Sequence, residues 1–337
     1  MYLIAPHKTQ YKANLHCHSI LSDGKKTPEE LKAMYKAKGY SILSITDHET
    51  PKNHSDLNDD DFLTITGYEA YVRPDAQCRS DAYSKEIHMN LFARDPANES
   101  IVCYNPKYCK YIPEEQKAQY HKVGSQRTRE YSVAYINELI QTAKENGYIV
   151  AYNHPWWSLE SEADILAYEG FFSMEMCNYG CYLTGRLEYN AALYDKMLLL
   201  GKKVACHSAD DNHNYDPVDS PYSDSFGAFT MIMPDDFSYD AVIDAMEKGE
   251  MYSSMGPLFQ EVSMEGNRIH IECSAVQRIM VFTGSKSPKG KIAPAGETIT
   301  SADFEIDARA KFVRVSIADQ YGNFADTRGF FRDELEF

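Results

Sequence analysis

The sequence lacks any apolar run of the ~18 residues that a membrane-spanning helix requires. Its first residues, MYLIAPHKTQYKANLH, also lack the basic stretch and apolar core of a secretory signal peptide. Eight cysteines are present, but none forms a CxxC pair, and their density is far below that of disulfide-framed secreted domains. We therefore expect a cytoplasmic protein with reduced thiols and no membrane partner.

Positive charge is also scarce. Lys plus Arg number 34 against 50 for Asp plus Glu, so the formal net charge is −16. This charge opposes the binding of polymeric nucleic acid. Bound divalent cations would offset it locally, so a small phosphorylated substrate remains compatible with it. No GxxxxGK[ST], GxSxG or strand-linked GxGxxG motif occurs, which leaves nucleotide-cofactor and serine-hydrolase functions without support.

Several short apolar runs carry a residue able to bind metal at or near their end. They are YKANLHCH, SILSITDH, DFLTITGYE, EIHMNLF, YIVAYNH, FFSMEMCN and KKVACHSADDNH. Runs of this length and composition predict strands buried on both faces. Helical patterns lie between several of them: one with Thr27 as N-cap and Pro28 in its first turn, stopping at Gly39, one over residues 129–145 and one over 187–200.

Strands alternating with helices predict a parallel sheet. Polar strand ends that converge on one point favour a closed barrel-like α/β fold of about seven strands, with an open doubly wound sheet as the alternative. After residues 249–257 the pattern changes to short alternating runs separated by turn residues. We therefore predict a main domain over residues 1–256 and a small antiparallel β module over 257–337.

One connection fits neither pattern. Residues 94–128, rich in Tyr, Lys and Pro, lie between two predicted strands. A connection this long is usually either a functional lid or a disordered loop. Both readings stay open from the sequence, and a lid over the active site is one of them.

The polar strand ends supply a set of candidate metal ligands. His16 and His18 point to the same face of a strand because side chains alternate with period two, whereas Cys17 points away. Further imidazoles and carboxylates follow at successive strand ends. The complete candidate set is His16, His18, Asp23, His48, Glu69, His88, His154, Asp211 and His213.

Nine nitrogen and oxygen ligands are more than one ion needs, so two or three divalent ions are expected. Imidazole mixed with carboxylate, without thiolate, suits Zn²⁺, Mn²⁺ or Fe²⁺. The alternative for any single histidine is a hydrogen-bonded core imidazole. Asp47, His207 and Asp210 are expected to orient ligands. The histidines without such a context are His7, His54, His121 and His270.

Taken in order, the motifs NLHCHSILSDG, ITDHE, GYE, EIHMN, YNHP and SADDNH resemble the polymerase and histidinol phosphatase (PHP) superfamily of metal-dependent phosphoesterases. The resemblance covers about residues 12–215. It implies a distorted seven-stranded (β/α) barrel with the nine candidate ligands at a two- or three-ion site, and a C-terminal β-sandwich typical of one branch. FFSMEMCN departs from some relatives, since it offers Glu175, Cys177 and Asn178.

The expected reaction is hydrolysis of a small phosphate monoester or diester by metal-bound hydroxide, with His207 or Asp210 protonating the leaving group. Two alternatives remain: an amidohydrolase-type ester or amide hydrolase, and a non-catalytic metal-binding scaffold. No lysine that could bridge ions ends a ligand-bearing strand, which favours the phosphoesterase. The oligomeric state cannot be read from the sequence. Candidate substrate-binding residues, each also compatible with a surface or rim position, are Trp156, Trp157, Asn178, Tyr179, Arg186, Lys122, Arg127 and Arg129.

Overall fold

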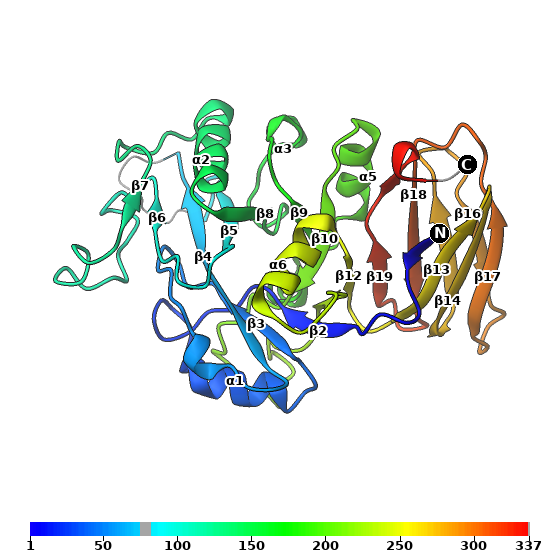
Figure 1. Cartoon of the computed structure of the whole chain (residues 1–337), viewed down its shortest axis with the longest axis horizontal. Coiled ribbons are helices and arrows are strands. Elements are labelled where there is room, and N and C mark those ends of the chain that lie inside the picture. Colours follow the sequence, from blue (N-terminus) through cyan, green and yellow to red (C-terminus); the bar gives the residue numbers. More distant parts are fainter. Residues whose placement is uncertain (75–81, 336–337) are drawn as a thin grey trace.

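The computed structural model describes residues 1–74 and 82–335. Figure 1 shows an α/β part, which holds all the helices labelled α, beside a part built of strands. None of the described helices has the length and apolarity needed to cross a membrane. Both chain ends lie in the part built of strands (Figure 1).

One curled sheet forms the frame of the α/β part. In spatial order its strands are β10 (Ala205–Ala209), β9 (Ser173–Asn178), β8 (Tyr148–Tyr152), β5 (Ile87–Ala93), β4 (Leu63–Val72), β3 (Ile42–Ile45) and β2 (Tyr11–Asn14). Just beyond β2 and β10 the two ends of this series meet. His18 N donates to Asn212 O at 3.0 Å, and Asp211 N donates to His16 O at 2.9 Å. The sheet therefore bends round far enough for its first and last strand ends to share hydrogen bonds.

The strand directions differ in part from the predicted parallel sheet. β2, β3 and β4 are parallel to one another, as are β8, β9 and β10. β5, however, runs antiparallel to both β4 and β8. Parallel neighbours need a crossover, usually a helix. No helix joins β4 to β5 among the described residues, so β5 returns alongside β4 in the opposite direction.

The helices of this part are α1 (Pro28–Lys36), α2 (Val133–Glu145), α3 (Glu162–Ala167), α4 (Tyr179–Cys181), α5 (Ala191–Leu199) and α6 (Tyr239–Lys248). The predicted capping of α1 is present, since Thr27 accepts from Glu30 N and the Glu30 side chain accepts from Thr27 N. α1, α2 and α5 are shorter than the sequence pattern predicted. α2 begins after its N-cap Ser132, because Arg129 is held in a buried ion pair upstream of the helix.

The residues that follow extend the sheet and add a second one. Beyond β2 the first sheet continues through β11 (Phe229–Ile232), β12 (Met251–Ser254), β19 (Phe324–Thr327), β18 (Phe312–Ala318), β15 (Arg278–Phe282) and β16 (Lys289–Ile292), and β20 (Phe330–Phe331) pairs with β18. The second sheet has the order β1 (Tyr2–Ile4), β13 (Phe259–Glu265), β14 (Arg268–Val276) and β17 (Ile299–Glu305). Their buried faces share one hydrophobic core, in which Val262 and Ile271 of the second sheet meet Val281 and Val315 of the first.

This arrangement gives an antiparallel β module of the kind predicted for residues 257–337, with one addition. β1, at the other end of the chain, pairs antiparallel with β13 and buries Ile4 in the shared core. The sequence pattern had placed these residues with the main domain. Without β1, the longer strand β13 would be the exposed edge of the second sheet. The short strand β1 covers that edge.

Residues 94–128 form a small ordered unit on the flank of the curled sheet. β6 (Ile101–Val102) and β7 (Lys122–Val123) pair within it, and a cluster of Ile101, Tyr104, Cys109 and Ile112 forms its core. The remaining short elements are the 3₁₀ turns Ser55–Leu57 and Arg332–Glu334 and the π segment Tyr182–Arg186.

Candidate metal centre

All nine candidate ligands lie at one end of the curled sheet. They come from strands β4 and β5 and from the loops that follow β2, β3, β8 and β10, so residues far apart in sequence meet there. His16, His18 and Glu69 are fully buried, whereas Asp23, His48 and His213 are partly exposed. Most of the set lines a cleft of about 490 Å³. His16 and His18 do not line it, but each contacts Asp211, which does.

The ligand atoms form four overlapping groups in which every atom lies within 4.8 Å of the others. Three groups are deep and linked by shared members. They are His16–His18–Glu69, His16–His154–Asp211 and His48–Glu69–His88. The fourth group, His18–Asp23–His48–His213, lies nearer the surface. His16, His18, His48 and Glu69 each belong to two groups. A neutral imidazole offers one lone pair and could serve only one ion, whereas the two oxygens of Glu69 could serve two.

Glu69 lies at the centre of the set. Its Oε1 is 3.0 Å from His88 Nδ1 and 3.2 Å from both His16 Nε2 and His154 Nε2, and its Oε2 is 2.9 Å from His48 Nδ1. Burial alone would raise the pKa of Glu69, but the imidazoles of His88, His16 and His48 hold that pKa well below its usual value. Glu69 is therefore a carboxylate able to bridge two cations.

The buried donor atoms fit a group of cations. Asp211 Oδ1 lies 3.1 Å from His16 Nε2 and 3.0 Å from His18 Nε2, yet makes no hydrogen bond of acceptable geometry with the described residues. His88 Nε2 is also buried without such a partner in this part of the chain. Burial, reinforced by His213 and His48, lowers the pKa of His18 to about 4, which keeps it neutral as a ligand must be. With only nitrogen and oxygen donors, the set suits Zn²⁺, Mn²⁺ or Fe²⁺.

Glu175 orients the deep ligands, a role that the sequence did not reveal. Its Oε1 is 3.1 Å from His16 Nδ1, and its Oε2 accepts from His154 N at 2.8 Å. A carboxylate on the far nitrogen of a ligand histidine fixes the ring and its tautomer. The available signal was its place near the end of a ligand-bearing strand. Asn178, predicted to bind substrate, instead donates to Glu175 Oε2 at 3.0 Å and to Asp211 Oδ2 at 3.1 Å.

Asp47 holds the loop that carries Asp23, as expected for a residue that supports the ligands. Its carboxylate accepts from Ser19 N at 2.8 Å, from Ser19 Oγ at 2.6 Å and from Ser22 Oγ at 2.6 Å. Gly24 lets this loop fold tightly, because a Cβ there would lie 2.2 Å from the carbonyl oxygen of His18.

His207 and Asp210, predicted as general acids, do not line the cleft. Asp210 is buried and accepts from the amides of Phe226, Gly227 and Ala228 at 2.7 to 3.0 Å and from Tyr35 OH at 2.7 Å. Burial outweighs these bonds and raises the pKa of Asp210 to about 7. His207 is buried with Nδ1 2.7 Å from Ser173 Oγ. Their contacts are with the 226–228 loop, Tyr35 and Ser173 rather than with the cleft.

Of the residues predicted to bind substrate, some line the cleft and others do not. Trp157 lines the cleft, with its ring 4.9 Å from that of His88 and 4.8 Å from that of His154, whereas Trp156 points outward with 63% of its surface exposed. Tyr179 packs its ring over Gly227. Arg186 is exposed and does not line the cleft.

The basic candidates upstream of α2 are engaged elsewhere. Lys122 lies over the ring of Tyr104, and Arg127 pairs with Glu138. Arg129 is fully buried and donates to Glu49, so it cannot meet a substrate. The basic side chains that do line the cleft are Arg73 and Lys110, which the sequence did not single out. Arg73 follows β4 at the ligand-bearing end, which was the available signal.

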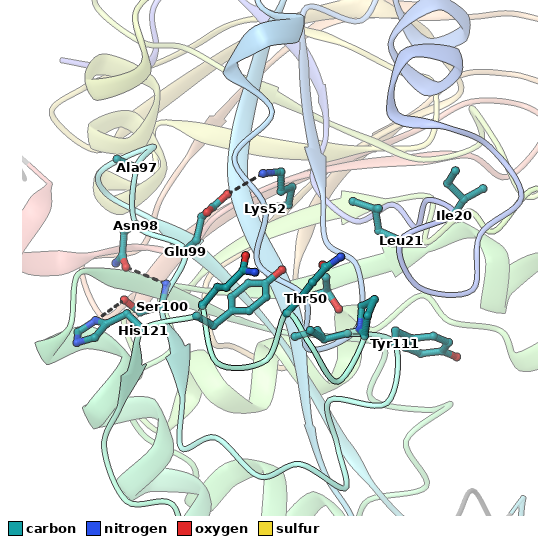
Figure 2. A pocket seen from close by; sticks show the side chains of 15 residues that line it. Ile20, Leu21, Thr50, Lys52, Ala97, Asn98, Glu99, Ser100, Tyr111 and His121 are labelled. Atoms are coloured by element: carbon teal, nitrogen blue, oxygen red, sulfur yellow. Dashed lines mark hydrogen bonds and ion pairs between the residues drawn. The ribbon is translucent and has the colours of Figure 1, made fainter.

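The four bystander histidines lie outside the ligand groups, as expected. His270 pairs with Asp303 in the second sheet, and His7 lies against Tyr2. His54 is buried, and His121 contacts Ser100. His121 borders a second cavity of about 720 Å³, which Figure 2 shows between the 20–21 loop and residues 94–121.

Residues 94–128 contribute to the metal site as well as to that second cavity. Tyr111 lines the second cavity (Figure 2), and its hydroxyl donates to Asp23 Oδ2 at 3.0 Å. Lys110, the preceding residue, lines the metal cleft. The segment thus borders the cleft, in line with the lid reading of the sequence, and it is ordered rather than a disordered loop.

Comparisons with known proteins agree with this geometry. The PHP domain family model matches residues 14–181. No curated protein matches the chain. A two-domain protein from Bacteroides vulgatus, described as containing a PHP-like metal-dependent phosphoesterase, aligns over 98% of both chains at 13% identity and a TM-score of 0.48.

Two shorter structures are also similar. A metal-dependent phosphoesterase from Bifidobacterium adolescentis aligns over 61% of this chain and 89% of its own at 17% identity and a TM-score of 0.39. An amidohydrolase from Chromobacterium violaceum with bound sulfate aligns over 60% of this chain and 87% of its own at 16% identity and a TM-score of 0.38. At this level of similarity these structures define neither substrate nor metal for the present chain. Its residues 14–181 form a PHP domain, and the chain belongs to the PHP family of metal-dependent hydrolases.

Proposed function

We propose that the protein is a phosphoesterase that hydrolyses a small phosphate monoester or diester at a site of two or three divalent ions, Zn²⁺, Mn²⁺ or Fe²⁺. The observation that carries this proposal is the convergence of nine histidines and carboxylates in four overlapping groups. In this proposal β2, β3, β4, β5, β8, β9 and β10 form the distorted seven-stranded barrel, and the β module is a C-terminal sandwich. The seven cysteines in the described residues are free and buried, in keeping with a cytoplasmic enzyme.

The ligands, the residues that orient them and the cleft walls each have a role in this reaction. Bound divalent ions supply Lewis acidity, which activates water and offsets charge on phosphoryl oxygens. Glu69 would hold ions at the deep positions through its two oxygens, and Glu175 fixes the ring of His16. Trp157 forms an apolar wall beside His88 and His154. Lys110 lines the same cleft and would contribute positive charge toward an anionic substrate, whereas Arg73 there pairs with Glu86.

A carbon-ester or amide substrate is the main competing possibility. Glu69 offers its two oxygens at the position between the ligand groups, and Lys110 is the one lysine among the described residues that lines the cleft. Lys110 reaches the cleft from the 94–128 segment rather than from a strand end. These features favour phosphorus over carbon as the centre attacked.

The test combines metal analysis with a substrate screen. Protein purified without chelator should contain two or three equivalents of metal and release phosphate from small esters when Mn²⁺, Zn²⁺ or Fe²⁺ is supplied. His16→Ala or Asp211→Ala should remove metal and lower activity more than about a hundred-fold, since even outer-shell changes cost 10–100-fold. His270→Ala is the control, because His270 pairs only within the β module.

Three results would contradict the proposal in different ways. Full activity in His16→Ala would show that the ligand set is wrong. Metal without phosphate release would redirect the search to carbon esters and amides. Absence of metal under all conditions would favour a non-catalytic scaffold.

A further inference from the structure

We propose that Tyr111 is a positioning residue that fixes Asp23 and thereby gives the outer ligand group its affinity for a cation. This inference rests on the metal site proposed above and concerns the group His18–Asp23–His48–His213. It assigns a function in the metal site to the 94–128 segment. Figure 2 shows Tyr111 on this segment, opposite Leu21 and close to the loop that carries Asp23.

The outer group depends more on such support than the deep groups do. Glu69 and His16 have side chains no more than 1% exposed, and packing holds them on every side. In contrast, the side chain of Asp23 is 27% exposed, that of His213 24% and that of His48 14%. A carboxylate side chain on an exposed loop samples several rotamers. Binding a cation restricts it to one of them, which costs conformational entropy.

Tyr111 supplies the missing constraint on Asp23. Its hydroxyl donates to Oδ2 at 3.0 Å across 88 residues of sequence. The other hydrogen bond to this carboxylate in the described structure comes from the adjacent Ser22 at 3.2 Å, and the hydroxyl of Ser22 has a closer acceptor in Asp47 at 2.6 Å. Oδ1 is then directed toward the open side of the group, 3.5 Å from His213 Nε2 and 3.9 Å from His18 Nδ1.

The tyrosine is itself held firmly. Its ring stacks on that of His48 with the planes 15° apart and the centroids 6.2 Å apart. The next residue, Ile112, is buried in the core of the 94–128 segment. Tyr108, three residues upstream, packs against Tyr71 and lies under the guanidinium of the buried Arg129. A donor on a rigid support loses little freedom when it orients its acceptor.

The chain offers a closely matched control in Tyr215. Its ring stacks on the ligand His213 with centroids 6.1 Å apart and planes at 18°, and a lysine lies over it as Lys110 lies over Tyr111. The Tyr215 hydroxyl, however, donates to none of the ligands in the described residues. Comparing Tyr111→Phe with Tyr215→Phe therefore separates the effect of ring stacking from that of the hydrogen bond to Asp23.

The experiment is a Mn²⁺ titration of the metal-free protein, followed by electron paramagnetic resonance of free Mn²⁺. Tyr111→Phe should weaken one equivalent about ten-fold or more while the others stay within two-fold of wild type. Tyr215→Phe should titrate like wild type. In an Asp23→Ala background, Tyr111→Phe should cause no further loss, because its effect passes through that carboxylate. The thermal midpoint of each metal-free variant should equal that of its parent.

The proposal is overturned if Tyr111→Phe leaves the isotherm unchanged, or if it weakens all equivalents together and lowers the metal-free thermal midpoint. It also falls if Tyr111→Phe still weakens binding in the Asp23→Ala protein. The readout needs no substrate, so a failed phosphatase screen with a normal Mn²⁺ isotherm would count against the proposed function and not against Tyr111. A wild-type protein that binds none of Mn²⁺, Zn²⁺ and Fe²⁺ would overturn both.

Discussion

Two buried carboxylates at the ligand-bearing end of the sheet, Glu175 and Asp210, have different partners. Glu175 faces the imidazole of His16, while Asp210 faces three backbone amides and Tyr35. Both look alike in the sequence, as acids among small and apolar residues near the ends of β9 and β10. The role of each carboxylate therefore depends on the direction in which its side chain points from the strand.

Glu175→Gln tests the orienting role at the residue scale. Glutamine keeps the shape and the bonds to His154 N but no longer offers a charged acceptor to His16 Nδ1. We expect metal affinity to fall 10- to 100-fold with the fold intact, measured by competition with a chelating dye and by circular dichroism. Glu188→Gln is the control, because Glu188 binds the amides of Trp156 and Trp157 outside the ligand groups. Equal losses in both variants would contradict the orienting role.

The candidate ligands could be predicted from the sequence because each lies at or near the end of a short apolar run. A polar residue at the end of an apolar run has few uses other than a site, and nine such positions reinforce one another. The orientation of His207 and Asp210 could not be foreseen. It depends on the register of β10 against β9 and on the 226–228 loop, which closes over Asp210 from outside its own strand.

At the element scale, the 94–128 segment is fastened by a buried ion pair. Arg129, at its end, donates from two nitrogens to Glu49 and reaches the carbonyls of Tyr71 and Cys103. Glu49 in turn accepts from Tyr71 N at 3.0 Å. This pair joins the segment to the residue that follows His48, so the position of Tyr111 depends on it.

Arg129→Met should leave Glu49 as an unpaired buried charge. We expect a loss of about 3–5 kcal/mol in the free energy of unfolding, the usual cost of breaking a buried pair. Urea denaturation measures it, and limited proteolysis should show cleavage within residues 94–128. Arg127→Met is the control, since Arg127 forms an exposed pair with Glu138 and lies over the ring of Tyr135, with no buried ion pair. A loss below about 1 kcal/mol would show that the pair is not what holds the segment.

The order of strands and helices was predictable to the extent that it follows local pattern. The capping box at Thr27 and the strand-then-helix succession are local, and both are present. The reversal of β5 and the late start of α2 depend on distant partners. β5 reverses because it pairs with β4 and β8 without a crossover helix, and α2 starts late because Glu49, 80 residues away, holds Arg129.

At the scale of the whole molecule, the α/β part and the β module are joined by one continuous sheet. The sheet runs unbroken from β12 to β19. Beside this junction Arg314 of β18 is buried and donates to Asp195 of α5 at 2.8 and 3.0 Å and to Asp326 of β19 at 2.6 Å. Asp326 also accepts from Tyr189 OH at 2.7 Å. The two parts should therefore unfold together.

Arg314→Met should make the α/β part and the β module unfold in separate transitions. Both tryptophans, Trp156 and Trp157, follow β8 in the α/β part, so fluorescence reports on that part alone, whereas far-ultraviolet circular dichroism reports on both parts. In wild type the two urea curves should coincide. In the variant they should diverge, with a loss of about 3–5 kcal/mol from the unpaired Asp326. Arg309→Met, which removes an exposed pair with Asp307, should leave the curves coincident. Coincident, unshifted curves in Arg314→Met would refute the coupling.

The pairing of β1 with β13 also bears on how the molecule is made. Tyr2 lies opposite Ser263, so during synthesis β1 waits for a partner made about 260 residues later. The strands from β2 to β10 are all made in the meantime and can pair with one another first. A chain interrupted before β13 would therefore hold the strands of the α/β part together with an unpaired β1.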